Sequence, residues 1–182
     1  PSITFAVEKM LSGGTLQPHT AHAVNLVLYI MCAWMLYFFV YRLGKIFQYT
    51  SNVNTLLSLV TALIFVSLPM HASMVANIKS RDGLLSFILG LTFLYGILIV
   101  FTEKKALTRF LWLAISLLAI TGATYSKLDG LNFVIAIPLL LFLVYQQIQW
   151  KQIARIAFIG ILSYRLFSIL FFSWMDQKSK LP

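Results

Sequence analysis

Charged residues are scarce in this chain. Asp, Glu, Lys and Arg make up 10% of its 182 residues, whereas about 25% is usual for a soluble domain. Hydrophobic residues make up 60%, so a soluble fold would lack the polar side chains needed to cover its outside. The composition therefore excludes an ordinary soluble domain and predicts an integral membrane protein.

Cysteine and acidic residues are scarcer still. The single cysteine, Cys32, lies inside an apolar run, which excludes an internal disulfide framework and predicts a small packing residue. His19 and His22 could share a helix face, but no third ligand is near them, so no metal site is predicted. With five acids in all, the sequence shows no paired-carboxylate motif, no nucleophile with its base and no Walker-type phosphate loop.

Long hydrophobic runs are what the sequence does contain. Each has roughly 15–20 residues, close to the ~20 that cross ~30 Å of hydrocarbon as a helix. None alternates apolar and polar residues as barrel strands do, and backbone groups in lipid must pair internally, which leaves helices. We predict an all-α fold, a polytopic transmembrane bundle of about six spanning helices over residues 21–175, in a single domain of residues 1–182. The runs are residues 23–41, 53–69, 84–101, 107–125, 131–145 and 156–175.

The first 20 residues differ from the runs. They can form an apolar face opposite Glu8 and Lys9, and two glycines then interrupt the pattern. We expect a short interfacial helix within residues 1–20, on the outward side, with Pro18 in the loop that follows. Because the chain begins without Met and ends abruptly, we also expect it to be a segment of a longer protein.

The charges of the connections predict an orientation. Residues 42–52, 102–109 and 146–155 carry seven Lys and Arg residues, against six in the opposite connections. The positive-inside rule then places this first group in the cytoplasm. The net charge of +9 comes mainly from such connections, where basic side chains contact lipid headgroups. No basic stripe with interleaved exposed aromatics is present, so nucleic acid is not expected as a partner.

Residues 68–85, LPMHASMVANIKSRDGLL, concentrate polar groups between two apolar runs. We expect a loop there, in which Arg81 could bind phosphate and His71 could donate to an anion or transfer a proton. Asp82 could orient either residue, serve as a weak candidate for a catalytic base, or coordinate a divalent cation. The alternative is a hydrated loop whose Ser80 or Asp82 caps the next helix.

Two further places could carry chemistry. Between the fourth and fifth runs, Lys127 suits a phosphate and Asp129 is its nearest counter-charge and a second weak candidate for a base; the alternative is a turn with a snorkelling lysine. Arg165 lies in the middle of the last run, where a charge costs at least about 2.5 kcal/mol, so it should face the protein interior or a polar cavity.

At these residues the sequence resembles the GT-C type membrane glycosyltransferases, closest to the bacterial relatives of the transmembrane and tetratricopeptide-repeat O-mannosyltransferases. Their loop reads approximately H-P-(V/I)-H-T-E-x-V-A-x-I-x-x-R-x-x-L-L, and a later segment reads S-K-E-x-(A/G)-(I/L). An H-x-x-N element comes before both, and an arginine lies in a later span. The matching residues are His22, Asn25, Pro69, His71, Val75, Ala76, Ile78, Arg81, Leu84, Leu85, Ser126, Lys127, Gly130 and Arg165.

The resemblance implies an outward site for a polyprenyl-phosphate-linked sugar, which is transferred to a Ser or Thr hydroxyl of an acceptor protein. Around the lipid phosphate or the sugar it implies His71, Arg81, Lys127 and Arg165. His22 and Asn77 are further candidate substrate-binding residues. The membrane would be the bacterial inner membrane with the site facing the periplasm, or the endoplasmic reticulum membrane with a lumenal site. Membrane lipids, tetratricopeptide repeats or partner subunits are the further partners expected.

The sequence also departs from the family pattern. The first loop histidine is replaced by Leu68, the loop glutamate by Ser73, and the glutamate after Ser-Lys by Leu128. The family's acidic catalytic motif lies upstream of Pro1, so we expect the base outside this chain. Two alternatives stay open: a non-catalytic membrane subunit on the same scaffold, and a transporter component in which Arg165 marks a substrate path.

Overall fold

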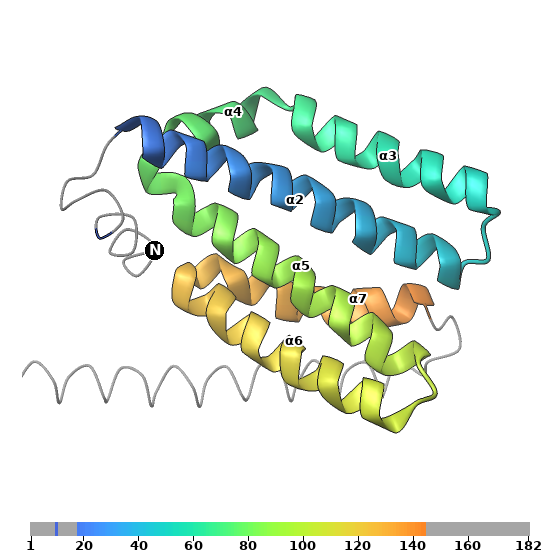
Figure 1. Ribbon diagram of the computed structural model, residues 1–182. Coiled ribbons are helices and arrows are strands. Elements are labelled where there is room, and N and C mark those ends of the chain that lie inside the picture. The colour runs from blue at the N-terminus through green and yellow to red at the C-terminus, as the bar shows by residue number, and fades with distance from the viewer. Residues whose placement is uncertain (1–9, 11–17, 145–182) are drawn as a thin grey trace, which may run out of the picture. The chain divides into compact units, whose positions relative to one another are not determined.

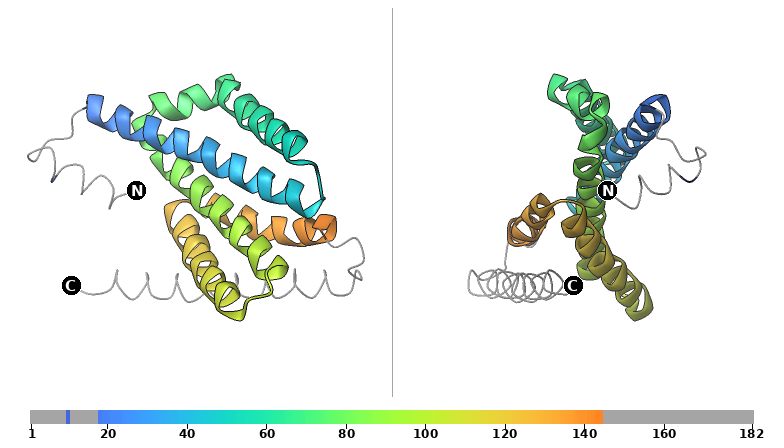
Figure 2. Two further views of the ribbon diagram at one scale, coloured as in Figure 1. Left: turned by 45° about the vertical axis from the view of Figure 1, so that its right-hand side comes forward. Right: turned by 90° about the vertical axis from the view of Figure 1, so that its left-hand side faces the viewer.

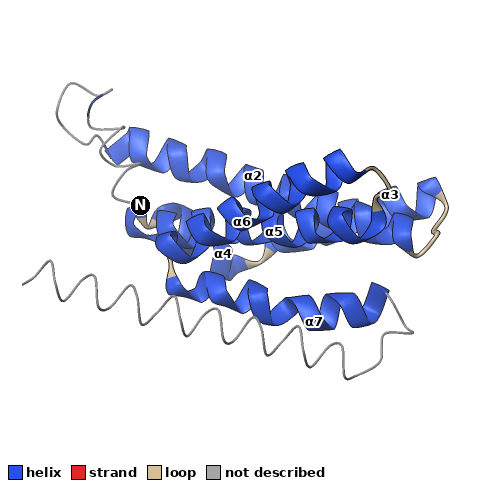
Figure 3. Ribbon diagram, turned by 90° about the horizontal axis from the view of Figure 1, so that it is seen from below, coloured by secondary structure: helices blue, strands red, loops and turns tan. Residues whose placement is uncertain are grey.

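The computed structural model describes Met10 and residues 18–144, and all described elements are helices (Figures 1 and 3). This confirms the all-α prediction for this part of the chain. Two compact units are distinguished, residues 1–133 and residues 134–182. The elements in order are α2 (Pro18–Ile46), α3 (Ser51–Ser67), α4 (Pro69–Ala76), the 3-10 helix η1 (Ile78–Ser80), α5 (Arg81–Thr102), α6 (Ala106–Ser126), the 3-10 helix η2 (Leu128–Leu131) and α7 (Asn132–Val144).

Three helical stretches in the described residues are long and apolar enough to cross a membrane. They are α2 with 29 residues, η1 with α5 as one stretch of 25 residues, and α6 with 21 residues. The α3 helix and the stretch Leu128–Val144 are apolar but shorter. Three of the six predicted spans thus correspond to helices that are candidate spans by length and composition. The run 156–175 and the proposed interfacial helix lie outside the described residues, apart from Met10 and the start of α2.

The helices α3 and α6 bury small side chains and expose large apolar ones. In α3 the buried residues Asn54, Ser58 and Ala62 recur every four residues, while Leu56 is 62% exposed. In α6 the buried residues are Ser116, Ala119 and Ala123, while Leu118 on another face is 75% exposed. An amphipathic helix on the surface of a soluble protein instead buries its large apolar side chains and exposes polar ones. Small residues at helix contacts and leucines on the outside suit a bundle surrounded by lipid.

The α5 helix is the central element of the first unit. It packs against both α2 and α6, and α2 also packs against α3 (Figures 1 and 2). Gly96 lets α5 approach α6 closely, because a Cβ there would overlap the Ser116 hydroxyl and lie 3.3 Å from the Trp112 carbonyl oxygen. The Ser116 hydroxyl is held in place by its own hydrogen bond to that carbonyl, at 2.7 Å.

The long helices α2, α3, α5 and α6 run in alternating directions, which brings alternate connections together (Figure 1). At one end Arg42 contacts Glu103 at 3.0 Å and Thr102 at 2.8 Å. At the other end the Ser126 hydroxyl donates to the Asp82 carbonyl at 2.9 Å. The connections 42–52 and 102–109 therefore share one end of the bundle, as predicted. The polar stretches 68–85 and 126–130 share the other, which we call the polar end.

The expectation of a loop at residues 68–85 was wrong. Pro69 begins α4, as proline does at a first helical position, where its missing N–H is not needed. The helix ends at Ala76 and is followed by Asn77, whose side chain accepts the backbone N–H of Lys79 at 3.0 Å. The 3-10 helix η1 then leads directly into α5. Pro18 likewise begins α2 instead of lying in a loop.

The second unit is described only as far as Val144. Its part of α7 contains Pro138 inside the helix, and Leu140 and Leu141 are buried. This helix corresponds to the predicted run 131–145, which is shorter than the others.

The contact at Gly96 gives a stability test. Gly96→Ala should lower the stability of the protein by about 1–3 kcal/mol, because the added methyl group meets a fixed hydroxyl and a backbone carbonyl. Gly83→Ala, in the same helix, is the matched control: its Cβ would lie 3.9 Å from Met74, so stability should stay equal or rise by up to about 1 kcal/mol. Thermal unfolding in detergent measures both, and equal melting temperatures would contradict the close packing.

Candidate functional site

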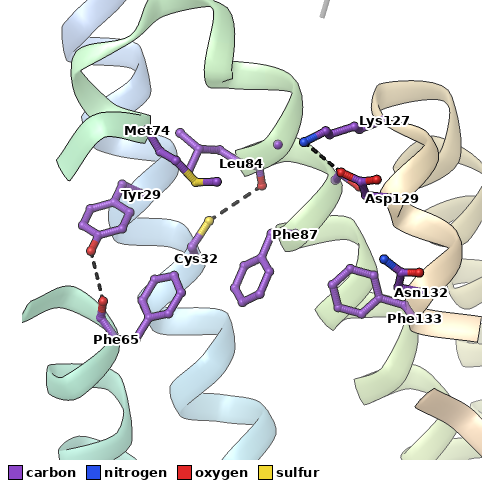
Figure 4. A pocket seen from close by; sticks show the side chains of 12 residues that line it. Tyr29, Cys32, Phe65, Met74, Leu84, Phe87, Lys127, Asp129, Asn132 and Phe133 are labelled. Atoms are coloured by element: carbon purple, nitrogen blue, oxygen red, sulfur yellow. Dashed lines mark hydrogen bonds and ion pairs between the residues drawn. The ribbon is translucent and has the colours of Figure 1, made fainter. Parts of the chain in front are cut away.

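A cavity of about 300 Å³ lies at the polar end of the first unit (Figure 4). Its walls come from α2, α3, α4, α5, η2 and the first residues of α7. The volume is at the lower end of the ~300–1,000 Å³ that small-molecule sites occupy. One side of the cavity is aromatic and the other carries polar groups.

Four aromatic rings from four different helices form a continuous wall of the cavity. Tyr29 stacks on Phe65 with ring centroids 5.6 Å apart, and Phe65 stacks on Phe87 at 5.3 Å. Phe87 meets Phe133 edge to face at 6.0 Å. Gly90 makes room for the last ring, because a Cβ there would overlap the Phe133 side chain. These rings give the cavity a rigid apolar surface.

Two cross-helix contacts hold this wall. The Tyr29 hydroxyl lies 3.2 Å from the carbonyl oxygen of Phe65 and 3.0 Å from that of Val66, at the end of α3. The Cys32 thiol points to the Leu84 carbonyl oxygen in α5, at 3.7 Å. Cys32 is buried, as predicted for a packing residue, and it also lines the cavity.

The polar side of the cavity carries an ion pair. The Lys127 ammonium lies 2.8 Å from the Asp129 carboxylate, with side-chain exposures of 44% and 66% (Figure 4). The hydrogen bond to Asp129, together with the attraction of its charge, raises the pKa of Lys127 above its ordinary value. Lys127 is therefore a permanent cation at the rim of the cavity. Ser86 and Asn132 also line it.

Arg81 does not line this cavity. Its side chain is 0% exposed, with Nε donating to Asn25 Oδ1 at 3.1 Å and Nη2 donating to the Ala21 carbonyl at 3.3 Å. The Asn25 amide in turn donates to the Asn77 carbonyl at 3.1 Å. These residues, Ala21, Asn25, Asn77 and Arg81, form what we call the arginine joint. It ties the start of α2 to the start of α5.

His22 lies beside the arginine joint, and together with Asn77 of the joint it lines a separate depression of about 630 Å³. His22 Nδ1 is 3.5 Å from the Val75 carbonyl oxygen. The lining of this depression is completed by Ser73, Ala76, Ile78, Lys79 and Ser80. The sequence-predicted residues thus fall into two groups, with Lys127 and Asp129 at the cavity and His22, Asn77 and Arg81 at or beside the joint.

In the sequence, Asp82 lies between the residues of the joint group, which end at Arg81, and the cavity residues Lys127 and Asp129. Its Oδ1 accepts the Gly83 backbone N–H at 2.8 Å, and its charge contributes to the raised pKa of Lys127, after the larger effect of Asp129. His71 belongs to the backbone of α4, but its side chain and the whole of Arg165 lie outside the described residues. In the part of the chain that the structure describes, no three His, Cys, Asp or Glu side chains gather as a metal site.

Sequence reasoning missed the aromatic wall, Ser86 and Asn132. The phenylalanines gave no signal, because they resemble the other large apolar residues of the runs. Asn132 did give one, as a polar residue at the start of an apolar run. Asn25 was matched only through the family resemblance, and its contact with Arg81 spans 56 positions of sequence.

The arginine joint gives a second stability test. Arg81→Ala should destabilise the protein by about 3 kcal/mol, since two buried oxygen atoms lose a charged donor and a cavity opens. Lys79→Ala removes an exposed cation two positions away and should stay within about 0.5 kcal/mol of the parent. Thermal unfolding compares them. An Arg81→Ala protein as stable as the parent would show that Arg81 has no structural role.

Comparisons of the chain with family models, curated proteins and solved structures gave no match. The chemistry of the cavity and of its polar rim is therefore the basis for a functional proposal.

Proposed function

We propose that this chain is a segment of a membrane glycosyltransferase, similar to the GT-C type, whose cavity at the polar end binds a polyprenyl-phosphate-linked sugar. One observation carries the proposal: a permanently charged lysine stands at the mouth of an aromatic-walled cavity, at the end of helices long enough to span a membrane. The site would face the periplasm of a bacterial inner membrane, or the lumen of the endoplasmic reticulum.

The cavity suits an amphiphile with an anionic group. Its aromatic wall offers apolar surface to a sugar face or to the first units of a polyprenyl chain. Lys127 offers a compact cation to a phosphate. A phosphate carries more charge than one carboxylate, so it can replace Asp129 as the partner of Lys127.

In the proposed function, Arg81 stabilises the walls of the cavity and does not contact the ligand. A side chain with no exposed surface and with fixed donors to α2 is not available to a phosphate at the rim. Arg81 instead keeps the starts of α2 and α5 together, and both helices contribute walls of the cavity. In this proposal it is a positioning residue.

Transfer requires a base that takes the proton of the acceptor hydroxyl as the hydroxyl oxygen attacks the sugar and the polyprenyl phosphate leaves. Asp129 is the carboxylate that lines the cavity, and Asp82 is the other carboxylate whose charge acts on Lys127. The alternative function, a subunit that binds the lipid without transfer, is favoured by the ion pair, because a carboxylate held by Lys127 is a weaker base.

Removing the cation tests the binding step. Lys127→Gln should weaken the binding of a short-chain polyprenyl phosphate by about 10- to 100-fold, which is the loss of one hydrogen bond to a charged group. Titration of purified protein in lipid nanodiscs measures the dissociation constant. Lys105→Gln, an exposed lysine at the opposite end, should leave it unchanged. Equal affinities of parent and Lys127→Gln would remove this site from the proposal.

Asp129→Asn separates the enzyme from the subunit. In both cases the binding of polyprenyl phosphate should tighten, because Lys127 loses a competing anion. If Asp129 is the base, transfer of sugar from a polyprenyl-phosphate donor to a Ser/Thr peptide should fall at least about 100-fold. Transfer that persists would place the base elsewhere, and a parent protein that binds but does not transfer would favour the subunit.

A further inference from the structure

Ser86 is an exception among the serine and threonine side chains of α5. The other two, Thr92 and Thr102, donate to the carbonyl oxygens of Ile88 and Leu98, four residues earlier, at 2.8 and 2.7 Å. This local bond is the usual way a hydroxyl is satisfied within a helix. The Ser86 hydroxyl is buried and has no hydrogen-bond partner among the described residues, although Ser86 is only 4% exposed.

The reason lies in the contact between α5 and α6. The carbonyl that Ser86 would use is that of Asp82, and it accepts the hydroxyl of Ser126 at 2.9 Å. Gly130 packs beside this buried oxygen and has no side chain there, since a Cβ at Gly130 would lie 3.0 Å from the Ser86 hydroxyl. A buried hydroxyl without a partner is destabilising. A residue that lines a cavity can recover that loss when a ligand enters.

Ser86 also has a defined position relative to the rim. It lies one helical turn, about 6 Å, beyond Asp82 along α5. The Asp82 carbonyl contacts Ser126, the neighbour of Lys127. The polar side of the cavity therefore has two levels, with the Lys127 cation at the rim and a neutral hydroxyl further in. The next residue of α5, Phe87, belongs to the aromatic wall.

We propose that the Ser86 hydroxyl hydrogen-bonds a hydroxyl group of the sugar, so that the sugar ring lies inside the cavity and the phosphate lies at Lys127. This inference rests on the proposed function and adds the direction in which the donor is bound. A neutral hydroxyl matches a sugar hydroxyl, which can both donate and accept, whereas the phosphate takes the cation. The aromatic rings that line the same cavity as Ser86 suit the apolar face of a sugar ring.

Two ligands test this direction of binding. The probes are a short-chain polyprenyl phosphate and the same lipid carrying mannose or glucose, titrated into the purified protein in nanodiscs. Ser86→Ala should weaken the binding of a sugar-bearing lipid by about tenfold, the loss of one hydrogen bond. It should leave the binding of the polyprenyl phosphate without sugar unchanged.

A matched serine controls for packing. Ser116 is equally buried, but its hydroxyl is satisfied by Trp112 and it does not line the cavity. Ser116→Ala should lower the melting temperature and leave both affinities unchanged. Ser86→Ala should leave the melting temperature of the empty protein equal or raise it, because it removes an unsatisfied group.

The outcomes separate this inference from the proposed function. If the parent protein binds none of the lipids, the proposed function fails and the inference with it. If the parent binds them and Ser86→Ala changes neither affinity, or changes both equally, the placement of the sugar is wrong while the phosphate site at Lys127 stands. A selective loss for the sugar-bearing lipid supports the inference.

Discussion

The burial of Arg81 is the constraint on which the first unit depends. It is the only charged side chain that is fully buried in the described part of the chain, and a buried guanidinium is tolerated only where its donors find oxygen atoms. Asn25 and Ala21 supply them. Tyr29 and Cys32 lie on the same buried stripe of α2, four and seven positions after Asn25. Fixing Arg81 on Asn25 therefore sets the register at which α2 faces α5.

That register also decides where the cavity forms. With α2 set against α5, the Cys32 thiol meets the carbonyl of Leu84, and Phe87 one turn further reaches Phe65 of α3. The opposite wall comes from η2 and the start of α7, where Gly90 admits the ring of Phe133. Small residues permit the close approaches, and the aromatic rings span the remaining gap. The position of the cavity thus follows from one buried charge, that of Arg81, and from glycines that let side chains and helices approach closely.

The helical architecture was largely predictable from the sequence, because apolar runs of this length form helices when they are surrounded by lipid. Scarce charge and long apolar runs predict helices for the described residues. If each long helix crosses the membrane, every second connection lies at the same end of the bundle. The Arg42–Glu103 pair shows this for two of them. The stretch 68–85 was misread because its polar composition resembles a loop, whereas the proline that begins α4 and the asparagine that ends it are local helix signals.

The roles of the cations were not predictable, because they depend on partners distant in sequence. Arg81 and Lys127 looked alike as candidates for a phosphate. A guanidinium has five donors on a planar group and can join several oxygen atoms at once, which makes it suitable for a buried joint. An ammonium on a flexible stem stays hydrated at a rim and can exchange one anion for another. Arg81 is fully buried with its partners, whereas the Lys127 side chain is partly exposed at the rim. In the proposed function, the ligand therefore contacts Lys127 and Ser86 and not Arg81.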